Sequence, residues 1–243
     1  MTSISFDAIH KHFSSSGKRH DVLRGLSFSA KPSDVIGLVG PNGAGKTTTL
    51  HLLMGHEQSD AGSLWVDELN VTELPFAEQK VLLRQTCSLL PENPHLPKYQ
   101  SGKNVVLEYG ILDGLSLEEA LEKANHIQTI LPIQSFWEKP CLHYSKGQAG
   151  LISLARVMML ERDVVLLDEP TIGLDFQATQ KVHTWIRGLS SQGKIVIVSS
   201  HLINDLQQLT PTIVGIDQGK EASSETIRTW LYLDLEQQTP FLD

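Results

Sequence analysis

One glycine-rich segment of the chain carries residue types that bind phosphate groups. Residues 40–47 read Gly-Pro-Asn-Gly-Ala-Gly-Lys-Thr and fit the pattern G-x-x-x-x-G-K-[ST] at every fixed position. The glycines let the backbone curl so that successive N–H groups point at phosphate oxygens, and a following helix adds its positive end. Lys46 can reach the β- and γ-phosphates, the Thr47 hydroxyl can bind Mg²⁺, and Thr48 lies near the α-phosphate. A chance glycine-rich turn is the alternative, but a strand before the segment and a helix after it favour a nucleoside triphosphate site.

Two adjacent acids could supply the rest of a hydrolytic site. Asp168 and Glu169 directly follow an apolar run at 164–167. In an open parallel sheet the carboxyl ends of the strands face the ligand crevice. Asp168 is then placed to hold Mg²⁺, directly or through water, and Glu169 can polarise the attacking water as a general base. A solvated acidic turn would explain the pair in isolation, but downstream of a complete phosphate loop the pair predicts nucleotide hydrolysis.

The elements that must position these groups alternate between strand and helix. An apolar run at 35–39 precedes the glycine loop and a helical pattern at 46–53 follows it. The alternation resumes with the run at 164–167, a helical pattern at 176–189 and an apolar strand at 194–198. This order predicts an α/β fold, with a mostly parallel sheet covered by helices on both faces.

A helical block interrupts the α/β pattern from about 91 to 150. Three prolines within 91–97 mark a loop, and two helical patterns follow at 103–112 and 116–131. The second pattern opens with Ser116-Leu117-Glu118-Glu119, which predicts a capping box. We interpret the block as an insertion in the α/β part.

Composition limits the partners of the chain. Its 243 residues carry a net charge of −8 and include 40% hydrophobic residues. An acidic balance argues against a nucleic-acid partner, which normally meets a basic face. No apolar run approaches the roughly 18 residues that span a bilayer, and the first residues lack the pattern of a secretory signal. We therefore expect the protein to stay in the cytoplasm, with any membrane connection made through a partner.

Three further segments resemble ABC ATPases. Residues 168–171 (Asp-Glu-Pro-Thr) followed by Gly-Leu-Asp at 173–175 look like the Walker B element and D-loop of that family. Residues 145–148 (Ser-Lys-Gly-Gln), with Leu-Ala-Arg at 154–156, are similar to its LSGGQ signature and the following helix. Ser-Ser-His at 199–201 resembles its switch histidine. All stand in the family's order over essentially the whole chain. The signature and D-loop together are specific to this family, whereas a phosphate loop is not.

The resemblance implies a fold and a working assembly. The implied fold is one ABC ATPase domain over 1–243: a P-loop NTPase core at about 1–90 and 158–243, an antiparallel β edge, and a helical subdomain at about 91–157. The implied activity is ATP hydrolysis that powers a separate polytopic membrane permease, which holds the chain on the inner face of the membrane. A second ATP-binding subunit packs head to tail, in a homodimer or a heterodimer.

The resemblance also assigns roles to residues. Ser145 and the Gly147 N–H would touch the γ-phosphate of an ATP bound by the partner subunit, a charge-assisted contact. His201 would contact the γ-phosphate within its own chain, and Asp175 would communicate across the interface. Phe13 stands where the family places an aromatic that stacks on adenine; a half-buried phenylalanine at a strand end is the alternative. The implied nucleotide-binding residues are Phe13, Gly40, Asn42, Gly43, Ala44, Gly45, Lys46, Thr47, Thr48, Ser145, Gly147, Gln148 and Asp175. The implied catalytic residues are Lys46, Glu169 and His201, and the implied Mg²⁺ ligands are Thr47, Glu92 and Asp168.

Two positions depart from the family pattern. Lys146 replaces the first glycine of the signature, and we expect the phosphate contact to survive because the serine, second glycine and glutamine remain. Glu92 stands where most relatives have glutamine; an ionised glutamate can ligate Mg²⁺ but cannot donate a side-chain hydrogen bond. Both departures, with the segment at 107–114, resemble the exporter subgroup that serves drugs, lipids, polysaccharides or similar cargo.

Two other functions compete with transport. A soluble ABC protein could drive cofactor assembly, translation or DNA maintenance, but the tandem second cassette, long coiled-coil insertion and zinc cysteines of several such relatives are missing here. A catalytically degenerate, regulatory subunit is the third hypothesis. The intact set of Lys46, Asp168, Glu169 and His201 counts against it.

Overall fold

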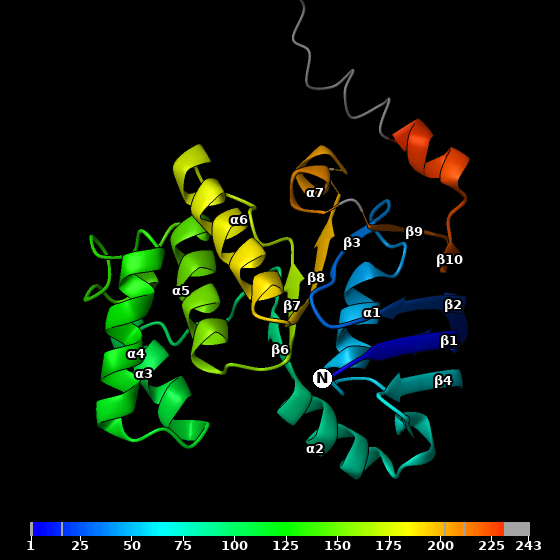
Figure 1. The fold of residues 1–243 in the computed structure, drawn as a ribbon, viewed down its shortest axis with the longest axis horizontal. Helices are drawn as coiled ribbons and strands as arrows, with labels where there is room; N and C mark the ends of the chain where they lie inside the picture. Colours follow the sequence, from blue (N-terminus) through cyan, green and yellow to red (C-terminus); the bar gives the residue numbers. More distant parts are fainter. Residues whose placement is uncertain (1, 16, 202, 211, 231–243) are drawn as a thin grey trace, which may run out of the picture.

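Two β-sheets with helices around them make up the computed structural model, which describes residues 2–15, 17–201, 203–210 and 212–230 (Figure 1). The larger sheet is parallel except for its last pair, β9 with β10. Its strands, in sheet order, are β10 (Lys220–Glu221), β9 (Ile213–Asp217), β3 (Val35–Val39), β8 (Ile195–Ser200), β7 (Val164–Asp168) and β6 (Cys87–Leu90). The smaller sheet is antiparallel, in the order β2 (Lys18–Ala30), β1 (Ile4–Ser15), β4 (Ala61–Val66) and β5 (Leu69–Asn70).

Seven helices and two 3-10 turns connect the described strands, and a further helical segment at 224–230 follows β10 (Figure 1). The helices are α1 (Lys46–Leu53), α2 (Phe76–Thr86), α3 (Gly102–Leu112), α4 (Leu117–Ile130), α5 (Lys146–Met159), α6 (Phe176–Ser191) and α7 (Ile203–Leu209). The 3-10 turns are η1 (Val71–Glu73) and η2 (Cys141–His143). Within the described ranges, no helix is both long and apolar enough to cross a membrane.

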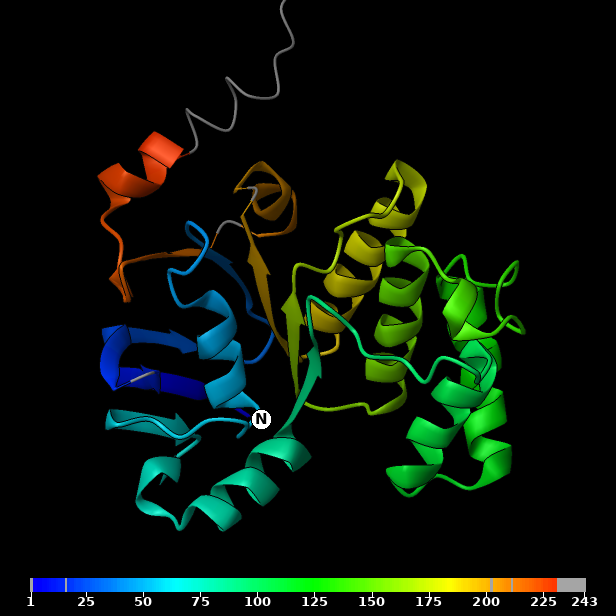
Figure 2. The same cartoon turned by 180° about the vertical axis from the view of Figure 1, so that it is seen from behind.

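The central strands are apolar because both of their faces are covered. Every residue of β3, β7 and β8 is buried. Alternate side chains enter two separate hydrophobic clusters: Val165 and Leu167 pack with α3 to α7, whereas Val164 and Leu166 pack with α1 and the antiparallel sheet. Seen from behind, α1 lies between the two sheets (Figure 2). The predicted parallel sheet with helices on both faces is confirmed.

Helices α3, α4 and α5 pack on one another at one end of the molecule, opposite the antiparallel strands (Figure 1). The predicted capping box is present at the start of α4, where Ser116 and Glu119 each bond the other's backbone. These helices and the face of the large sheet share one hydrophobic cluster. The division into a core and a helical subdomain with boundaries near 91 and 157 stays a prediction.

The antiparallel strands are longer than the sequence pattern indicates. Alternation is visible at residues 4–6 and 26–29, but β1 and β2 extend well beyond these. The register of the pair shifts between Phe6 and Ile9, and Ala8 has a φ of 48°. This bulge moves later side chains to the other face, which breaks the alternation that identifies a strand. Helix α2 was not predicted either, because only Gln79 and Leu83 of it are buried.

Candidate functional site

The glycine loop connects β3 to α1 and has the backbone geometry of a phosphate cradle. Gly43 and Gly45 have φ values of 80° and 117°, which side chains rarely adopt. Gly40 is needed for a different reason: a Cβ there would lie 2.2 Å from the carbonyl oxygen of Ile216. The loop therefore brings its N–H groups to the start of α1, where the positive end of the helix dipole also lies.

Lys46 is buried and folds back onto this loop. Its ammonium donates hydrogen bonds to the carbonyl oxygens of Gly40 at 2.6 Å and Pro41 at 3.3 Å. Burial lowers the pKa of Lys46, while the nearby carboxylates of Glu169 and Asp168 act in the opposite direction. The charge is thus held beside the loop, within reach of any anion that the loop binds.

Asp168 joins the phosphate loop to the neighbouring strands. It ends β7, and its Oδ2 accepts a hydrogen bond from the Thr47 hydroxyl at 2.8 Å. Its Oδ1 accepts one from the Ser199 hydroxyl on β8. Glu92, which follows β6, lines the same cavity. A hydroxyl and two carboxylates are hard oxygen donors, so the three predicted metal residues fit Mg²⁺.

Glu169 is held in an unusual backbone conformation beside His201. Its φ is 52°, in the left-handed region that non-glycine residues seldom occupy and that often marks functional sites. Its backbone N–H donates to the carbonyl and hydroxyl oxygens of Ser199, both at 3.2 Å. Its Oε1 lies 2.9 Å from His201 Nδ1. Two of the three predicted catalytic side chains therefore meet beyond the carboxyl ends of β7 and β8.

A cavity of about 430 Å³ collects these groups and has a volume suited to a small ligand. It is lined by His20, Val22, Asn42, Gly43, Ala44, Gly45, Lys46, Thr47, Thr48, Glu92, Asp168 and Glu169. His20 and Val22 were not predicted. They come from β2, which packs against the loop so closely that a Cβ on Gly45 would lie 2.6 Å from the Leu23 side chain. The packing of the antiparallel sheet on the loop places these two residues in the cavity, and no sequence pattern marks them.

The predicted signature residues lie at the start of α5 and do not line this cavity. Ser145 is the N-cap of α5 and accepts a hydrogen bond from the Gln148 N–H at 3.2 Å; Gln148 accepts one in return from the Ser145 N–H. Asp175 is the N-cap of α6, and its side chain accepts a hydrogen bond from the Ala178 N–H at 2.8 Å. The starts of α5 and α6 thus lie apart from the phosphate loop of their own chain.

The start of α5 touches the turn before α6 at two glycines. A Cβ on Gly147 would lie 2.2 Å from the carbonyl oxygen of Gly173, so no other residue fits there without a shift. Lys146, in contrast, is exposed at the first position of α5. The structure therefore explains why a side chain fits at the first glycine position of the signature, whereas one at the second would force a shift.

Phe13 lies one strand away from the cavity. It pairs with His20 in the register of β1 and β2, its side chain is 38% exposed, and the Lys11 ammonium lies 4.9 Å from its ring centre. An exposed ring beside a cavity-lining residue is compatible with adenine stacking, which stays a prediction.

Comparison with known proteins shows the family. Residues 23–172 match the family model described as ABC transporter. The chain belongs to the ABC transporter family. It carries the ATP-binding domain of that family, and the predicted ABC ATPase fold is confirmed by solved cassettes. A dimeric bacterial ABC transporter cassette superposes with a TM-score of 0.82 at 20% identity, covering 90% of this chain and 97% of the other. A bacterial Atm1-family ABC exporter with ATP bound superposes with a TM-score of 0.78 at 23% identity, covering 98% of this chain and 42% of the other.

Curated relatives of this ABC protein include exporters and an importer. It is 28% identical to Nod factor export ATP-binding protein I of Paraburkholderia xenovorans, covering 90% of this chain and 69% of that one. The protein of the same name from Burkholderia pseudomallei is 30% identical, with coverage of 84% and 66%. Ribose import ATP-binding protein RbsA of Oceanobacillus iheyensis is 27% identical over 97% of this chain but 47% of its own length. The chain thus spans about two thirds of the Nod factor export relatives.

Proposed function

We propose that this ABC protein is the ATP-hydrolysing subunit of an exporter and powers a separate membrane permease. The observation that carries the proposal is the convergence of the phosphate loop, Asp168, Glu169 and His201 at the ends of β3, β7 and β8. Export is favoured over import because the relatives named for Nod factor export match with high coverage of both chains.

Each site residue of this chain has its own role toward bound ATP. The loop N–H groups receive the phosphates, and the Lys46 ammonium exchanges its loop carbonyls for the β- and γ-phosphate oxygens. Thr47, Asp168 and Glu92 would hold Mg²⁺, whose charge offsets that of the phosphates. Glu169 accepts a proton from the attacking water while the water oxygen bonds to the γ-phosphorus, and the bond from that phosphorus to the β,γ-bridging oxygen breaks, so that ADP and phosphate leave. His201 orients the Glu169 carboxylate and meets the γ-phosphate.

The signature completes the site of a second subunit. Ser145 and Gly147 do not line the cavity of their own chain, which supports a head-to-tail dimer in which they contact the partner's ATP. The Gly147 N–H and the positive end of the α5 dipole supply positive charge to the γ-phosphate. Two subunits therefore close around ATP and separate after hydrolysis.

A variant that binds ATP but hydrolyses it slowly can test whether ATP joins two subunits. Glu169→Gln keeps the shape of the side chain and removes the base, so this variant should bind ATP and accumulate as a dimer. Size-exclusion chromatography with light scattering, with and without ATP, measures that dimer. Adding Ser145→Arg should abolish it while single-chain nucleotide binding persists. A Glu169→Gln protein that binds ATP and stays monomeric at high concentration would contradict the shared site.

The permease is proposed to dock on the helical block that begins near Glu92. This block carries large apolar side chains in solvent: Tyr99 is 87% exposed and Leu112 is 84% exposed. Its first residue lines the nucleotide cavity, so the same segment can respond to ATP and contact the permease. The protein would then be cytoplasmic and bound to the membrane only through its partner.

A further inference from the structure

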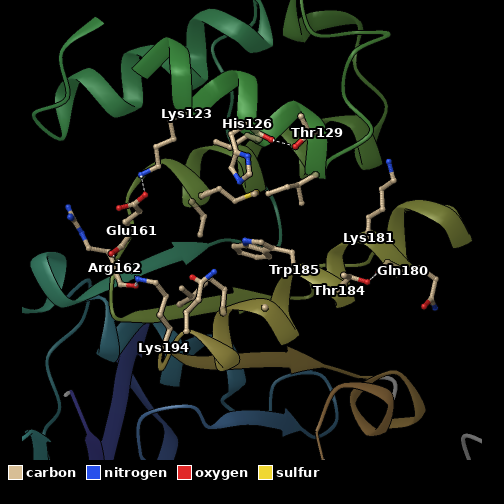
Figure 3. Close-up of a pocket in the computed structure, with 18 residues that line it drawn as sticks. Lys123, His126, Thr129, Glu161, Arg162, Gln180, Lys181, Thr184, Trp185 and Lys194 are labelled. Atoms are coloured by element: carbon tan, nitrogen blue, oxygen red, sulfur yellow. Dashed lines mark hydrogen bonds and ion pairs between the residues drawn. The ribbon is translucent and has the colours of Figure 1, made fainter. Parts of the chain in front are cut away.

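A second cavity, of about 820 Å³, lies on the face of the large sheet that the helices α4 to α6 cover (Figure 3). Helix α4 forms one wall, α6 forms the opposite wall, and the end of α5 closes the space between them. In the described part of the chain, its lining shares no residue with the nucleotide cavity. This cavity therefore needs an explanation other than ATP binding.

On each wall, lining residues four positions apart form a stripe along one face of the helix. Lys181, Trp185 and Leu189 follow one another at four-residue intervals and so share one face of α6. His126 and Ile130 do the same on α4. Figure 3 shows His126 and Trp185 projecting from opposite walls. Large apolar side chains line the cavity: Ile127, Ile130, Val157, Met158, Val165, Trp185 and Leu189.

The rim of this apolar cavity is basic, although the chain as a whole carries a net charge of −8. Its lining includes four cations, Lys123, Arg162, Lys181 and Lys194, against the single carboxylate of Glu161. The Lys123 ammonium pairs with Glu161 at 2.7 Å, and Arg162 pairs with Asp113 outside the cavity.

Among the four lining cations, Lys181 is the one whose charged group makes no hydrogen bond or ion pair within the described residues. Lys194 is occupied by the backbone carbonyls of Glu161 and Arg162, at 3.1 and 2.9 Å. Across residues 2–15, 17–201, 203–210 and 212–230, no salt bridge involves Lys181 or the His126 ring. An acidic group in the cavity would therefore meet a charge that no side chain of the described chain neutralises.

We propose that this cavity binds a small amphipathic anion, with an apolar and preferably aromatic body and one acidic group. The volume lies in the range of cavities that enclose small ligands. The Trp185 indole offers a flat apolar surface for the body of the ligand. Lys181 lies one helical turn from Trp185 and supplies a charge-assisted contact to the acidic group.

Two dyes of matched shape test the proposal on the full chain. The probe 1-anilinonaphthalene-8-sulfonate has a planar aromatic body and one sulfonate, and N-phenyl-1-naphthylamine is its neutral counterpart. Saturating MgATP keeps the nucleotide site occupied during the fluorescence titrations. We expect Lys181→Glu to weaken the sulfonate probe by roughly tenfold or more and to leave the neutral probe unchanged. Arg187→Glu is the control, because it makes the same charge change on α6 at a residue outside the cavity lining.

Energy transfer from tryptophan reports where the probe binds, whereas the titration reports its affinity. Trp185→Phe should lower energy transfer from tryptophan to the bound sulfonate probe and change its Kd by less than about threefold, since an aromatic side chain remains. Thermal unfolding curves show that each variant is folded. Equal weakening by Lys181→Glu and Arg187→Glu, displacement of the probe by MgATP, or energy transfer that does not depend on Trp185 would overturn the proposal.

Discussion

Glu169 combines a strained backbone with a partner, His201, that directly follows the neighbouring strand β8. Its carboxylate is only 9% exposed and its Oε1 lies 2.9 Å from the His201 ring nitrogen. Glu169→Gln should slow ATP hydrolysis by about 10²–10⁴-fold, since a general base contributes that much, and leave ATP affinity nearly unchanged. Steady-state ATPase assays and nucleotide titration measure the two effects. Hydrolysis within a few fold of wild type would show that another group activates the water.

Glu92 should be tolerated but should tune the rate. Glu92→Gln removes a negative charge from the cavity and restores a hydrogen-bond donor, so we expect ATPase activity to change by less than about tenfold, or ~1.4 kcal/mol of barrier. Glu92→Ala removes the ligand and should lower activity further. The measurement is ATPase activity of the assembled transporter over a range of Mg²⁺ concentrations. If all three proteins have equal activity and equal Mg²⁺ dependence, Glu92 is not a metal ligand.

Residue chemistry was the most predictable part of the site. The pattern around Lys46 fixed the loop, and Asp168 and Glu169 stood out because an apolar strand ends in them. His20 and Val22 carry no such signal, since they reach the cavity only through the packing of β2 on the loop. Sequence spacing shows which residues follow a strand, whereas contacts between sheets depend on the whole fold.

At the scale of elements, the contact between the start of α5 and the turn before α6 makes a sharp prediction. Gly147→Ala places a Cβ 2.2 Å from the Gly173 carbonyl in the unshifted structure, so the helix start and the turn must separate. We expect a loss of about 1–3 kcal/mol in the free energy of unfolding and a weaker ATP-dependent dimer. Denaturant unfolding and light scattering measure these changes.

Lys146→Gly is the matched control for this contact, because it restores the family glycine one position earlier. That side chain is exposed, so the cost should stay near the ~1 kcal/mol of a glycine in a helix. A Gly147→Ala protein that is as stable as the wild type, or more stable, would mean that the Gly147 contact is unimportant.

Elements with one strong signal were predicted well, and elements that depend on distant partners were not. The boundaries of β3 and α1 follow from an apolar run and a glycine turn, and α4 from its capping box. Helix α2 buries too narrow a stripe to be recognised, and the bulge at Ala8 hides most of β1. In both cases tertiary contacts decide the structure, which a local pattern does not record.

At the scale of the whole molecule, the permease proposal predicts how the protein behaves in cells. Purification in mild detergent should recover a polytopic membrane protein with this chain. Leu112→Asp should reduce that recovery, because it places a charge on an 84% exposed apolar residue of the proposed docking block. ATP binding by the purified subunit should be unaffected, which serves as the control. Recovery of the chain without any polytopic partner would favour a non-transport function.

The strand order of the large sheet also determines when each strand can pair with its neighbours during protein synthesis. Strand β3 carries the phosphate loop, yet its two neighbours in the sheet, β8 and β9, are made much later. The ribosome must advance from Val39 to Ile195 before β3 acquires its first neighbour, which takes about 8–30 s at ~5–20 residues per second. Ribosome-bound chains stalled before β8 emerges should therefore fail to retain a photoreactive ATP analogue that released full-length chains capture. The nascent protein has to keep an apolar strand from aggregating throughout that interval, so its yield should depend on chaperones that bind during translation.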